Sequence, residues 1–150
     1  MTLKDAINFF ESLKTETTKK SEIKVYEKFL HILTALKGRT FTADEIQSIE
    51  NELDHLNLKS NSENSKKFYK KALSKFEAYL KETFSLTTKG HYTNMSVSLG
   101  ILFGVAFGGI IGSFFEKPLG LSFGMCIGMF VGAFIGNHLD SKAKETGNLL

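Results

Sequence analysis

The chain of 150 residues carries 19 Lys and Arg, 16 Asp and Glu and a net charge of +3, with 42% hydrophobic residues. These averages are ordinary for a soluble protein, but residues 1–92 hold 16 of the basic and 13 of the acidic residues. The asymmetry excludes a uniform soluble globule and a disordered chain, and the single Cys126 excludes a disulfide scaffold.

Residues 1–85 have the apolar spacing of about four amphipathic helices and no alternating strand pattern. A Thr followed three residues later by a carboxylate is a capping box, and it predicts helix starts at Thr2 and Thr42. Ser21 and Ser65 are candidate caps for the second and fourth helices. The expected buried faces are Leu3, Ile7, Phe10 and Leu13; Ile23, Tyr26, Phe29, Leu30, Leu33 and Leu36; Ile46, Ile49, Leu53 and Leu56; and Phe68, Tyr69, Ala72, Leu73, Phe76 and Leu80.

The third and fourth expected helices carry opposite charge. Residues 44–54 hold five acids and no base, whereas residues 59–81 hold seven lysines against two acids. One interpretation is that the basic helix rests on anionic lipid, which attracts each nearby Lys by ~1 kcal/mol. The other is that it packs against the acidic helix or is only a solvated face. The lysines in question are Lys66, Lys67, Lys70, Lys71, Lys75 and Lys81.

Two uncharged apolar segments follow, at residues 95–115 and 119–139. Each has 21 residues and would span about 31 Å as a helix, which matches a hydrocarbon core of about 30 Å. The alternative is a pair of buried helices in a soluble core, but the rest of the chain has too little apolar surface to cover them. The sequence therefore predicts two membrane spans.

The short connection at residues 116–118 requires the two spans to form an antiparallel hairpin, and Pro118 suits the first turn of the second helix. Lysines flank the outer ends of the spans, at Lys81, Lys89, Lys142 and Lys144. The positive-inside rule then predicts that both termini are cytoplasmic. We expect a bacterial cytoplasmic-membrane protein, because the apolar hairpin comes late in the chain and no cleavable signal is recognisable.

The expected fold is therefore all-α. It consists of a cytoplasmic helical domain at residues 1–85, a linker at 86–94, a transmembrane hairpin at 95–139 and a polar tail at 140–150.

Glycines recur every four residues along both spans. Close helix packing in lipid needs small residues on one face, and this register supplies them. In one arrangement the two glycine faces meet inside a single hairpin; in the other they meet neighbouring copies in a homo-oligomer. The helix-packing glycines are Gly100, Gly104, Gly108, Gly112, Gly120, Gly124, Gly128, Gly132 and Gly136.

Over residues 95–139 the chain resembles the glycine-zipper membrane proteins, through the segments LGILFGVAFGGIIG and LGLSFGMCIGMFVGAFIG. The resemblance is one of packing motif. It implies close helix packing, while the functions of such proteins range from channels to anchors and envelope components. The hairpin is also similar to the rotor-ring subunit of ATP synthases, but its second span has no central carboxylate to carry an ion.

No catalytic or metal-binding motif is present in the sequence. The four histidines are scattered, and Cys126 lies in the middle of an apolar span. We expect no enzyme activity, no cofactor and no nucleic-acid binding. The expected function is a membrane anchor or scaffold that packs and self-assembles through its glycine helices, with the bilayer, further copies and an unidentified cytoplasmic protein as partners. The alternative is an oligomeric pore lined by the hairpin helices.

Overall fold

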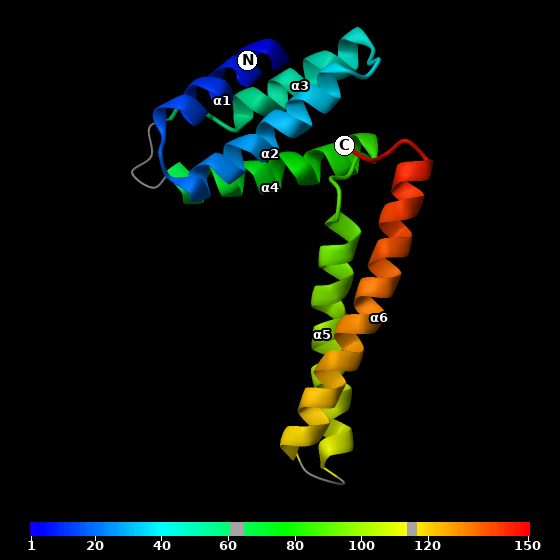
Figure 1. Cartoon of the computed structure of the whole chain (residues 1–150). Helices are drawn as coiled ribbons and strands as arrows, with labels where there is room; N and C mark the ends of the chain where they lie inside the picture. Colours follow the sequence, from blue (N-terminus) through cyan, green and yellow to red (C-terminus); the bar gives the residue numbers. More distant parts are fainter. Residues whose placement is uncertain (61–64, 114–116) are drawn as a thin grey trace. The chain divides into compact units, whose positions relative to one another are not determined.

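The computed structural model describes residues 1–60, 65–113 and 117–150, which form six helices and, within these ranges, no β-sheet (Figure 1). The predicted all-α fold is thus confirmed. The chain divides into two compact units, one of residues 1–86 with Leu150 and one of residues 87–149. The helices are α1 (Leu3–Glu16), α2 (Lys20–Lys37), α3 (Ala43–His55), α4 (Ser65–Phe84), α5 (His91–Gly112) and α6 (Lys117–Glu145).

Both predicted capping boxes are formed. The Thr2 hydroxyl accepts the Asp5 N–H at 3.1 Å, and the Asp5 carboxylate accepts the Thr2 N–H at 3.3 Å. Hydrogen bonding of the Asp5 carboxylate to the side chain and to the backbone N–H of Thr2 holds the pKa of Asp5 below its usual value. Thr42 and Glu45 make the equivalent pair at the start of α3. The prediction of a Ser21 cap was wrong, because α2 begins at Lys20 and its N-cap residue makes no side-chain cap hydrogen bond.

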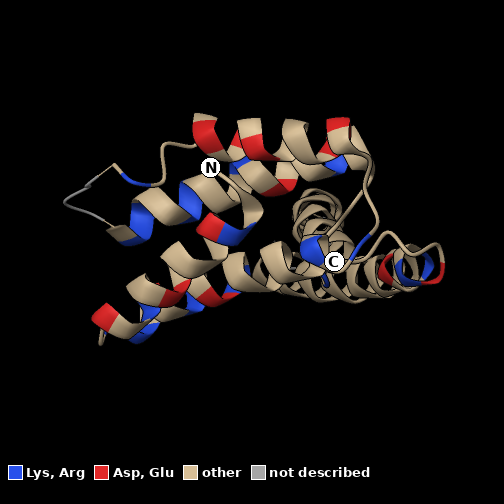
Figure 2. Cartoon of the chain, turned by 90° about the horizontal axis from the view of Figure 1, so that it is seen from above, with Lys and Arg blue, Asp and Glu red and all other residues tan. Residues whose placement is uncertain are grey.

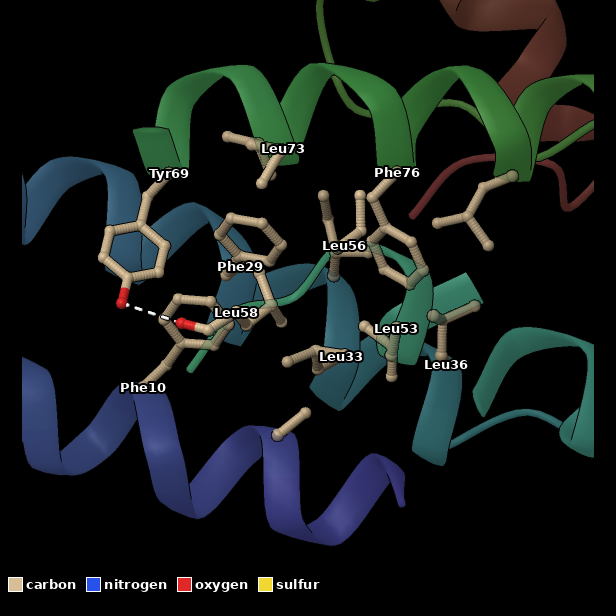
Figure 3. Packing of buried hydrophobic residues seen from close by; sticks show 14 of the residues in the cluster. Phe10, Phe29, Leu33, Leu36, Leu53, Leu56, Leu58, Tyr69, Leu73 and Phe76 are labelled. Carbon is tan, nitrogen blue, oxygen red and sulfur yellow. Dashed lines mark hydrogen bonds between the residues drawn. The ribbon is translucent and has the colours of Figure 1, made fainter. Parts of the chain in front are cut away.

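Aromatic rings link three helices in the core of the first unit (Figure 3). The ring of Phe10 in α1 stacks on Phe29 of α2, with centroids 4.3 Å apart, and Phe29 stacks on Phe76 of α4 at 6.4 Å. The Tyr69 hydroxyl donates to the Leu58 carbonyl at 3.0 Å, which satisfies its polar atom inside the core. Burial raises the pKa of Tyr69.

The predicted apolar faces form most of this core, with two kinds of difference. Ile46 was expected to be buried, but 37% of it is exposed. Ala6, Val25, Ile32 and Leu58 were not expected in the core and are buried. Ala6 precedes Phe10 by one helical turn and shares its face, whereas Leu58 follows the end of α3 and has no helical period to reveal it.

The second unit is an antiparallel pair of helices, α5 and α6, which contact each other along their length (Figure 1). Both helices extend beyond the uncharged segments, because α5 begins at His91 and α6 continues to Glu145. Pro118 lies in the first turn of α6, as expected. The end of the first uncharged segment and the start of the expected connection, residues 114–116, fall outside the described residues.

Candidate functional site

Helices α5 and α6 are long and apolar enough, by length and composition, to cross a membrane. They contain 22 and 29 residues, or about 33 and 44 Å at 1.5 Å per residue. Only 17% and 11% of their most apolar windows are buried. A core helix of a soluble protein would be mostly covered by other elements, and these two are not.

The outward surface of the hairpin is made of large apolar side chains. Phe103, Phe107, Phe123, Phe130 and Phe134 are between 57% and 79% exposed. Figure 2 shows charged residues on the N-terminal helices and near the ends of the hairpin. A contiguous apolar surface of this extent is unfavourable in water and marks a membrane or protein contact.

The glycines of the two helices face each other across the hairpin. A Cβ atom added at most of them would come within 3.0 Å of a backbone atom of the opposite helix, so no side chain larger than hydrogen fits there without a shift. Gly109 is outside this register, and a Cβ there would meet nothing within 4 Å. The glycines in this tight contact are Gly100, Gly104, Gly108, Gly120, Gly124, Gly128, Gly132 and Gly136.

The contact continues without interruption along the hairpin. Near one end Gly108 faces Gly120 and Gly124, and near the middle Gly104 faces Gly124 and Gly128. Gly112, from the same series, is buried and lies against Gly120. Of the two uses expected for the glycines, contact within a single hairpin is the arrangement in the described chain.

Beyond the last glycine of α6, the contact becomes polar. The Asp140 carboxylate accepts the N–H groups of Tyr92 and Thr93, both at 3.1 Å, and lies 2.6 Å from the Thr93 hydroxyl. It therefore caps the first turn of α5 from the opposite helix, supplying acceptors for N–H groups that lack an intrahelical partner. This pairing was not predicted, because Asp140 and Thr93 are 47 residues apart in the sequence.

An apolar groove of about 530 Å³ runs along one face of the hairpin. Its floor contains the facing glycines and its walls contain Phe103, Phe107 and Val131, while Ser96 is the one polar side chain among its described lining residues. Cys126 is exposed and unpaired by any disulfide. Within the described ranges, no group of three or more His, Cys, Asp or Glu residues is placed to hold a metal ion.

The lysines of α4 lie on the solvent side of that helix. Lys66, Lys70, Lys71 and Lys75 are exposed, and none forms an ion pair with an acid in the described part of the chain. Lys67 is also exposed, and Lys81 is half-buried.

Two acids of α3 contact the first residues of the chain. Glu50 accepts the Leu3 N–H at 3.1 Å, and Asp54 pairs with the amino group of Met1. The contact between α3 and α4 includes a hydrogen bond of 2.6 Å between Ser48 and Tyr79. Glu50 and Asp54 are therefore engaged with the first residues of the chain.

A comparison with known proteins gives no relative. No protein-family model, curated protein or solved structure matches this chain.

Replacing Gly108 or Gly128 by Leu should force α5 and α6 apart, because the new side chain would collide with backbone of the opposite helix. We expect each variant to lower the thermal unfolding midpoint of the purified protein in detergent, by an amount equivalent to about 1–3 kcal/mol. Gly109→Leu is the matched control, since that position is open and Leu favours a helix more than Gly does. Equal midpoints for all three variants would contradict the packing argument.

Replacing Asp140 by Ala should loosen the first turn of α5, because three hydrogen-bond donors lose their acceptor. Loss of a cap costs about 1–2 kcal/mol, so we expect roughly tenfold faster hydrogen exchange at the Tyr92 and Thr93 amides. Glu145→Ala is the control, because it also removes a carboxylate from the end of α6. The role of Asp140 is refuted if both variants leave the exchange rates of these amides unchanged.

Proposed function

We propose that this protein is an integral membrane protein in which the α5–α6 hairpin anchors the N-terminal helical unit at a bilayer surface. The observation that carries the proposal is the combination of a charge-free apolar exterior with glycine faces turned inward. Water would disfavour the exposed Phe, Leu and Ile side chains, whereas lipid tails accept them. Close packing of the glycine faces supplies helix association where the hydrophobic effect is absent. The hairpin thus packs in the manner of a glycine zipper.

The proposal has both termini on the cytoplasmic side of a bacterial membrane. Lys89 precedes α5, and Lys142 and Lys144 lie in the last turn of α6, so positive charge gathers at the open end of the hairpin. The N-terminal unit would then act as a scaffold on that side. Its exposed α4 lysines, Lys66, Lys70, Lys71 and Lys75, have the chemistry to meet anionic headgroups.

Lys substitutions at Phe107 and Phe130 test membrane insertion. Both side chains are exposed and lie near the centres of the uncharged segments 95–115 and 119–139, so the double variant adds charge there without touching the glycine contact. Each charge costs at least about 2.5–3.5 kcal/mol in the bilayer core. We expect the wild-type chain to pellet with membranes and resist alkaline extraction, and the double variant to be released.

Thr34→Lys is the control for this experiment, because it adds a charge at an exposed position of α2. It should pellet like the wild type. Recovery of the wild-type chain as a soluble monomer after ultracentrifugation without detergent would refute membrane anchoring.

The proposal extends to self-assembly through the outer faces of the hairpin. The glycines are occupied within one chain, so a contact between copies would use the exposed aromatic side chains and the apolar groove. We expect the mass of the intact protein in a native-like lipid environment to correspond to more than one copy. A mass of a single chain would restrict the function to anchoring. The groove offers no polar path for ions, so we favour a dry assembly over a pore.

A further inference from the structure

A cavity of about 410 Å³ with several polar side chains in its lining lies at the open end of the hairpin, where the two uncharged segments give way to charged flanks. Lys89 lines it from the segment before α5, Asn94 from the first turn of α5, and Asn137, Ser141 and Lys144 from the end of α6. All of its lining residues belong to the second unit. The cavity is therefore built by the hairpin itself.

A backbone hydrogen bond joins the two chain segments that flank this cavity. Thr87 donates its N–H to the Asn148 carbonyl at 2.8 Å, which joins the segment before α5 to the segment after α6. Gly90, which follows Lys89, is the N-cap residue of α5 and has a φ of 78°, a left-handed conformation that would be strained for a residue with a side chain. Leu149 completes the lining. The two lysines are thus attached to segments that are hydrogen-bonded to each other.

The charged side chains that line the cavity have a net positive charge, because Lys89 and Lys144 outnumber Asp140. Asp140 also lines the cavity, but both of its carboxylate oxygens are bonded to donors in the first turn of α5. Lys89 and Lys144 are exposed, and neither forms an ion pair within the described ranges. Amide side chains of Asn94 and Asn137 add neutral donors beside them. Two lysines and neighbouring amides form a site suited to a singly charged phosphate diester.

The depth of the cavity matches the headgroup layer of a bilayer. Lys144 lies five residues beyond the uncharged segment that ends at Leu139, a rise of about 7.5 Å along the helix. The polar layer on each side of the hydrocarbon core is about 5–8 Å thick. Lys89 lies a similar number of residues before the other uncharged segment. In an inserted hairpin, the cavity would therefore lie at the level of the lipid phosphates.

We propose that this cavity binds the phosphate headgroup of an anionic phospholipid, one lipid per hairpin, with Lys89 and Lys144 as the charged contacts. The inference rests on the proposed membrane insertion and adds a specific lipid site to it. This site differs from the α4 lysines, most of which are exposed and would attract anionic lipid by charge alone, without a shared cavity.

Lipid titration of the full-length protein, followed by native mass spectrometry, tests the site. We expect the wild type to retain one phosphatidylglycerol in preference to phosphatidylcholine. Lys144→Ala should weaken this binding about fivefold, and Lys89→Ala with Lys144→Ala about 25-fold, since each Lys contributes one near-surface charge interaction. Lys142→Ala is the matched control, because Lys142 is exposed in the same helix turn and does not line the cavity.

Three outcomes would overturn the lipid site. They are equal retention of phosphatidylcholine, an equal effect of Lys142→Ala and Lys144→Ala, and displacement of phosphatidylglycerol by millimolar inorganic phosphate. The last would identify the ligand as the free ion.

Flotation with neutral phosphatidylcholine vesicles separates this inference from the proposed function. A wild-type chain that floats but shows no lipid preference overturns the site alone. A chain that does not float overturns membrane anchoring as well.

Discussion

The hairpin depends on direct contact between the backbones of α5 and α6. Every glycine in the facing series costs the helix about 1 kcal/mol relative to Ala, and that cost recurs through both helices. In exchange, the two helix backbones lie so close that a single methyl group on a facing glycine would meet the opposite backbone. Dispersion between closely packed backbones does not require water, so this contact remains effective in lipid.

Each of the two units is stabilised internally by a different interaction. In the first unit, Phe10, Phe29 and Phe76 are fully buried, and removal of their apolar surface from water stabilises the fold. In the second unit the large side chains point outward and the smallest residues face inward. The inversion explains why average composition is a poor guide to this protein. It also explains why the groove and the outer aromatic surface need a lipid or protein covering.

Local sequence rules predicted what depends on local chemistry. The capping boxes at Thr2 and Thr42 were predictable because the partner carboxylate lies only three residues away. The length of the uncharged segments and the period of the glycines were equally visible. Ile46 was misassigned because helical period locates a face but does not reveal whether a neighbouring helix covers its first turn.

What the sequence concealed depends on contacts between distant residues. The Asp140 cap joins the two ends of the hairpin, and nothing in the neighbourhood of Asp140 indicates its partner. The cavity between Lys89 and Lys144 was hidden for the same reason, although both lysines had been noticed as flanking charges. Likewise, the sequence left open whether the acids of α3 face the basic helix, and the structure places Glu50 and Asp54 in contact with Leu3 and Met1.

A repeat of four residues has a geometric weakness, which is that it does not define a unique alignment. Sliding one helix by four residues along the other would again set glycine against glycine through most of the hairpin. The pairing of Asp140 with Tyr92 and Thr93 has no such translational copy, since no second carboxylate lies one repeat away on α6. The glycines thus determine how near the helices lie, and the hydrogen bonds of Asp140 select one alignment among otherwise equivalent ones.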